Sequence, residues 1–143
     1  MSDLRERPID PDRAVPVPFV GEYDDGRIDH ASVNRKRVIQ CALSRICGLC
    51  GNSLEWPIAF VGSVEESRGN AFTYPPLHVA CAEDALAIYA PLGDGFLGRG
   101  VAPAEWALVA TGGFELERPA NRTGDQRLFF HPNSVSEQRS VRA

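Results

Sequence analysis

The feature that most constrains this chain is a set of two residue pairs whose side chains are typical metal ligands. Cys47 and Cys50 are separated by two residues, and after 27 intervening residues His78 and Cys81 repeat the same spacing. A CxxC segment can turn both sulfurs toward one point, and residues i and i+3 lie on one face of a helix. The spacing therefore predicts that three cysteines and one histidine bind a single metal ion.

The sequence around the second pair indicates how its ligands are held. Two prolines precede residues 77–90, whose Ala and Leu content favours a helix that ends at Pro91. His78 and Cys81 then fall in the first turn, where the helix dipole favours a thiolate. Zinc with three thiolates and one imidazole is tetrahedral and leaves no position for water, so we expect Zn²⁺ as a structural cofactor.

Other chemistries of these ligands stay open at this stage. Another metal, a metal cluster or free redox thiols would use the same residue types. A thioredoxin-like pair is disfavoured because CxxC follows an expected helix and precedes a strand, and a zinc deaminase is excluded because HVA stands where H-x-E is required. The fourth cysteine, Cys41, is expected to be a small buried hydrophobic residue, with a role as replacement ligand as the alternative.

The composition is that of one globular domain. With 143 residues, of which 43% are hydrophobic, the chain can bury a core without obligatory staples. No apolar run reaches the ~18 residues of a membrane span, and the polar, acidic start does not resemble a signal peptide. We therefore expect a cytoplasmic protein without a membrane partner, whose cysteines stay reduced and available as ligands.

The expected organisation is a single zinc-binding α+β domain over residues 15–131, between a flexible N-terminal segment at 1–14 and a flexible tail at 132–143. Apolar residues recur at helical spacing over 31–46, which predicts an amphipathic helix that Asp29 or Ser32 could cap. The remaining expected elements are a strand at 56–63, a loop at 65–70, a returning strand at 71–74, and a small antiparallel β meander built from 105–117 and 126–131.

The order of these elements resembles a treble-clef zinc finger over residues 45–90, with a zinc knuckle, a hairpin and a helix that carries the second ligand pair. Over about residues 15–130, PVPFVGEYDDGRIDH, CGLCGNSLEWPIAFV, PPLHVACAEDALAIYAPL and EWALVATGGFELE occur in that order. This set resembles a family of small zinc-binding proteins of actinobacteria and their phages. The resemblance implies a zinc-binding fold with ligands at Cys47, Cys50, His78 and Cys81, and it implies no particular activity.

Three functional hypotheses follow from these observations. The first is a protein-interaction or adaptor module, which binds another protein or a second copy of itself with one or two aromatic residues left outside the core. The second is a nucleic-acid-binding zinc finger, although the net charge of −4 argues against a generally basic surface. Its basic helix at 34–45 has no acidic residue and would contact phosphates through Arg35, Lys36, Arg37 and Arg45.

The third hypothesis is a metal- or thiol-dependent enzyme. A closed coordination shell disfavours it, and no histidine lies between Cys50 and His78, where an HNH-type nuclease would need its base. His30 and His131 are far from the cysteines in sequence and are expected to be surface or capping residues. We therefore expect that the protein is not a hydrolytic enzyme.

Overall fold

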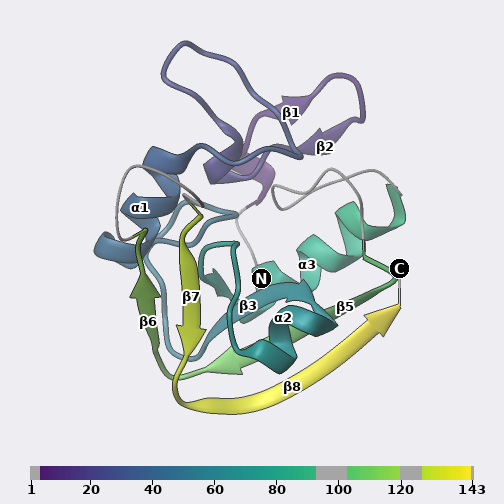
Figure 1. Ribbon diagram of the computed structural model, residues 1–143. Helices are drawn as coiled ribbons and strands as arrows, with labels where there is room; N and C mark the ends of the chain where they lie inside the picture. The colour runs from purple at the N-terminus through teal and green to yellow at the C-terminus, as the bar shows by residue number, and fades with distance from the viewer. Residues whose placement is uncertain (1–3, 93–102, 120–126, 143) are drawn as a thin grey trace.

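The computed structural model describes residues 4–92, 103–119 and 127–142, and its centre is a four-stranded antiparallel sheet (Figure 1). Every residue of β3 (Ile58–Ser63) is buried, and β5 (Glu105–Thr111) is buried except for its first residue. Strands that are apolar on both faces are typical of a sheet covered on both sides. The strands lie in the order β4 (Leu77–His78), β3 (Ile58–Ser63), β5 (Glu105–Thr111) and β8 (Val135–Arg142).

Two helices follow strands of this sheet without an intervening loop. After β3 the chain turns into α2 (Val64–Gly69), where the side chains of Ser63 and Glu66 form a capping box. After β4 it turns into α3 (Val79–Tyr89), which a 3-10 turn, η3 (Ala90–Leu92), continues. None of the described helices is long and apolar enough to cross a membrane.

A second, two-stranded sheet packs on the first through aromatic rings. It consists of β6 (Phe114–Glu117) and β7 (Phe129–Pro132), which pair in antiparallel orientation. Phe60 of β3 lies 5.5 Å from Phe114 and 5.6 Å from Phe130, measured between ring centroids. Such edge and tilted contacts add to the free energy of area burial, so the aromatic cluster joins the two sheets.

The N-terminal third forms a layer that ends in α1 (Arg35–Ser44). It contains a 3-10 turn η1 (Leu4–Glu6), the paired strands β1 (Ile9–Asp10) and β2 (Val15–Pro16), and a 3-10 turn η2 (Phe19–Gly21). Val17 and Val20 are fully buried. The side chain of Asn34 caps α1 by accepting a hydrogen bond from the backbone N–H of Lys36.

The α+β class and the helices around residues 31–46 and 77–90 are confirmed, although Asn34, rather than Asp29 or Ser32, caps the first helix. The expected loop at 65–70 is wrong, because the Ser63 and Glu66 capping box starts α2 there. The expected returning strand at 71–74 is also wrong, since β3 pairs instead with β4 and β5. Only Phe72 of that segment makes a β-bridge, with Phe130.

The expected meander is partly correct. The strands at 105–111 and 114–117 exist, yet β5 joins the large sheet while β6 pairs with β7. The ends of the chain also carry more regular structure than we expected. Most of the tail predicted at 132–143 is strand β8 alongside β5, and the segment 1–14 contains η1 and β1. Residues 120–126 are outside the described part of the chain, and they include the first residue of the strand expected at 126–131.

Candidate metal centre

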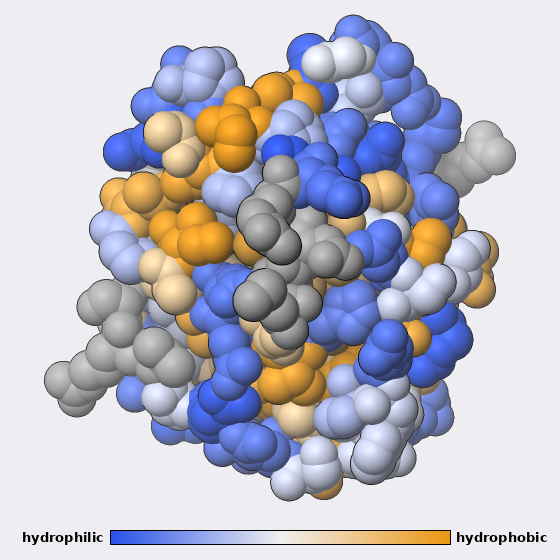
Figure 2. All heavy atoms as spheres, turned by 180° about the vertical axis from the view of Figure 1, so that it is seen from behind, coloured by the Kyte–Doolittle hydropathy of each residue, from blue (hydrophilic) through white to orange (hydrophobic). Residues whose placement is uncertain are grey.

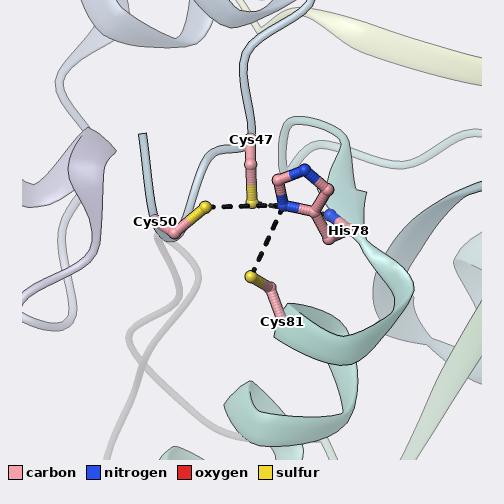
Figure 3. A group of neighbouring side chains, drawn as sticks. All are labelled: Cys47, Cys50, His78 and Cys81. Atoms are coloured by element: carbon pink, nitrogen blue, oxygen red, sulfur yellow. Dashed lines mark hydrogen bonds between the residues drawn. The ribbon is translucent and has the colours of Figure 1, made fainter. Parts of the chain in front are cut away.

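The four predicted ligands meet where the N-terminal layer joins the large sheet. Cys47 and Cys50 lie in the loop between α1 and β3, His78 is the last residue of β4, and Cys81 lies in the first turn of α3. His78 pairs with Ile58, the first residue of β3, and this register places His78 at the end of the sheet where β3 begins. Figure 3 shows the three sulfurs arranged around Nδ1 of His78.

The distances among these atoms fit one four-coordinate metal ion. All four donor atoms lie within 4.8 Å of one another, and Nδ1 of His78 lies 3.4 Å from Sγ of Cys50 and 3.7 Å from Sγ of Cys81. In a tetrahedron with metal–sulfur bonds of about 2.3 Å and a metal–nitrogen bond of about 2.0 Å, the nitrogen–sulfur edge is about 3.5 Å. The group could therefore hold a metal ion without a large rearrangement.

The turn that contains Cys47 and Cys50 depends on its glycines. Gly51 has a φ of +82°, a left-handed conformation that favours glycine, and its N–H donates to the carbonyl of Cys47. The N–H of Gly48 donates to the carbonyl of Pro76, which ties the turn to the residue before β4. A Cβ atom on Gly48 would lie only 2.6 Å from Cγ of Pro75. The two halves of the ligand set are thus joined by close backbone packing.

The orientation of the His78 ring leaves the correct nitrogen for a metal. Its Nε2 lies 2.8 Å from the carbonyl oxygen of Ser53. Because a carbonyl can only accept, Nε2 carries the proton, and the lone pair of the neutral ring is on Nδ1. A hydrogen bond from the distal ring nitrogen to a carbonyl is the usual support of a histidine ligand.

The protein also stabilises negative charge on the first cysteine. The backbone N–H groups of Leu49 and His78 point at Sγ of Cys47, at 3.4 Å and 3.5 Å. Burial opposes ionisation, but hydrogen bonds from the thiols of Cys50 and Cys81 and from backbone amides outweigh it and lower the pKa of Cys47 to about 3. Side-chain hydrogen bonds of Cys81 with Cys47 and Cys50, together with burial, raise the pKa of Cys81.

In this arrangement the Cys47 thiolate shares the protons of the neighbouring thiols. A divalent cation would take the place of the shared protons and allow the remaining thiols to ionise, as metal binding by thiols requires. The cluster could therefore hold a cation.

Cys41 is outside this group. It is fully buried on α1, and burial raises the pKa of its thiol to about 12. The prediction of a small buried residue is confirmed, and Cys41 belongs to none of the groups of described residues that could hold a metal ion.

A second cluster, formed by Asp10, Asp29 and His30, was missed from the sequence. His30 is only 7% exposed, so the expected surface position is wrong, and its Nδ1 lies 2.7 Å from a carboxylate oxygen of Asp10. This hydrogen bond lowers the pKa of Asp10. The partners are 20 positions apart in sequence, which hides the contact from pattern analysis. The hydrogen bond between His30 and Asp10 joins β1 to the segment before α1, which suits a structural role.

The four basic residues predicted for nucleic acid lie on α1 and at its C-terminal end. Arg35 and Arg45 are exposed, whereas Lys36 forms an ion pair with Asp24. Arg37 is half-buried, donates to the carbonyl of Phe19 and lies over its ring, 4.4 Å from the centroid. The helix thus brings the four residues together, and the charges of Lys36 and Arg37 already have partners within the chain.

Comparison with protein-family models, with curated proteins and with solved structures found no match for this chain. The resemblance to a zinc-binding family of actinobacteria and their phages therefore stays a prediction from the sequence.

Proposed function

We propose that the protein binds one structural zinc ion through Cys47, Cys50, His78 and Cys81, and that the ordered domain acts as a protein-interaction or adaptor module. The observation that carries the zinc proposal is the convergence of three sulfurs on Nδ1 of His78. Thiolate-rich sets with one imidazole favour zinc over hard cations such as Mg²⁺ and Ca²⁺. Four protein donors also fill a tetrahedral shell, which disfavours an enzyme with a metal-bound water.

The arrangement supports a treble-clef-like module as the frame of this site. The CxxC turn, the β3 and β4 pair and the helix α3 follow one another in the expected order. The insertion of α2 between β3 and β4 is the main departure from a simple hairpin. We propose the treble-clef relationship on this order of elements.

The face of the molecule drawn in Figure 2 supports a small docking site more than a large obligate interface. On the face in Figure 2, apolar side chains reach the surface in separate patches between hydrophilic ones. Permanent interfaces bury large and more continuous apolar areas. A nucleic-acid role is the weaker alternative, because Lys36 and Arg37 are engaged by Asp24 and Phe19.

Metal analysis of anaerobically purified protein tests the zinc proposal. We expect about one zinc per chain, lost together with native secondary structure in His78→Ala, because structural zinc sites contribute on the order of 10 kcal/mol to folding. Cys41→Ala is the matched control: it removes a buried cysteine outside the cluster, and we expect it to keep its zinc. A folded wild-type chain without metal, or a His78→Ala variant with full zinc content, would contradict the proposal.

A further inference from the structure

A groove runs along one side of the metal centre. Its volume is about 580 Å³, and its walls include Cys50 and His78 together with the loop before β3, the start of α3 and part of β8. Three of the four proposed zinc ligands, Cys50, His78 and Cys81, therefore line a concave surface of the size that accepts a peptide side chain and its backbone.

The groove is lined by negative charge. Glu6 of η1, Glu55 of the loop before β3 and Glu137 of β8 reach it from three distant parts of the sequence. There is neither lysine nor arginine among its described lining residues. Arg139 pairs with Glu137 from outside this lining, so part of the charge is neutralised. A zinc ion with three thiolates would add a further net negative charge.

One large aromatic side chain stands at this groove. Trp56 is 74% exposed, while the other tryptophan, Trp106, is fully buried. The indole is held against the backbone at Gly112, where a Cβ atom would lie 2.7 Å from Nε1 of Trp56. An exposed indole beside carboxylates is a favourable surface for a cation, which the ring face and the acidic groups attract together.

We propose that this groove binds a segment of a partner protein by placing a lysine or arginine side chain against Trp56, among the carboxylates of Glu6, Glu55 and Glu137. The proposal rests on the proposed function, since zinc orders the wall that contains Cys50 and His78. The sign of the charge selects a cationic peptide and disfavours nucleic acid at this face.

A fluorescence titration of the zinc-loaded full chain tests this inference. The probe is a blocked peptide with two central arginines, and the matched peptide has two glutamates in their place. We expect a saturable change in tryptophan emission with the arginine peptide, weakened by salt, and no saturable change with the glutamate peptide. Because cation–π contacts contribute about 0.5–2 kcal/mol, Trp56→Ala should weaken binding by roughly 2- to 30-fold, measured by calorimetry.

Charge variants give the second arm of the test. Glu55→Gln should weaken binding of the arginine peptide, whereas Glu65→Gln, an exposed glutamate on α2 outside the groove, should leave it unchanged. The inference is overturned if the arginine peptide does not bind, if Trp56→Ala and Glu55→Gln bind as wild type does, or if the glutamate peptide or a single-stranded oligonucleotide binds at Trp56 instead. Zinc content is measured on the same samples. A folded, zinc-loaded chain that does not bind the arginine peptide would therefore contradict the groove proposal without contradicting the zinc proposal.

Discussion

At the scale of single residues, the metal centre depends on groups that are close together in sequence. The CxxC turn and the HxxC turn each place two donor side chains by local geometry, which is why the grouping of these four residues could be predicted from spacing alone. The supporting contacts could not be predicted, because the carbonyl of Ser53 that orients His78 and the Pro76 carbonyl bound by Gly48 depend on tertiary packing.

Gly48 gives a residue-scale prediction. We expect Gly48→Ala to lower the free energy of unfolding of the zinc-loaded protein by about 1–3 kcal/mol, because the new methyl group would meet the ring of Pro75 at 2.6 Å. Urea unfolding followed by circular dichroism measures the change. Gly69→Ala is the control, since a Cβ atom there has no neighbour within 4 Å and lies in a helix that favours alanine. Equal stability of Gly48→Ala and wild type would show that the turn does not need this close approach.

At the scale of elements, the positions of helices and strands could be predicted from the sequence more reliably than the pairing of the strands. The helix α1 follows from apolar spacing, the helix α3 from Ala and Leu content between prolines, and the strand β3 from a short apolar run, and all three signals are local in sequence. Pairing was harder to predict: β5 could join β6 in a meander or β3 in the large sheet, and only packing between distant segments decides this. The strand β8 was missed because residues 136–140 are all polar and give no alternation of apolar and polar residues, as expected for an exposed edge.

The edge strand gives a prediction at this scale. Truncation after Ser134 removes β8 and leaves the backbone groups of β5 without partners along one edge. We expect the free energy of unfolding to fall by at least about 2 kcal/mol, measured by urea titration with zinc present.

The control for this truncation separates the backbone pairing from a surface ion pair. Glu83→Gln removes only the contact between Arg139 of β8 and α3, and we expect a loss of at most about 1 kcal/mol. If the truncated chain were as stable as the full chain, residues 135–142 would behave as the flexible tail that the sequence suggested.

At the scale of the whole molecule, the metal centre lies where separately built parts meet. The cysteine turn extends from the N-terminal layer, His78 belongs to the large sheet, and Cys81 belongs to α3. A bound ion would therefore join the N-terminal layer to the sheet as well as close a local loop. This position explains why we expect loss of one ligand to affect the fold far beyond the site.

The most direct test of the central claim is X-ray absorption spectroscopy at the zinc edge of the purified protein. The account predicts a four-coordinate ion with three sulfur neighbours at about 2.3 Å and one nitrogen neighbour at about 2.0 Å. A first shell that contains an oxygen ligand, or fewer than three sulfurs, would contradict a closed structural site and would point to chemistry at the metal itself.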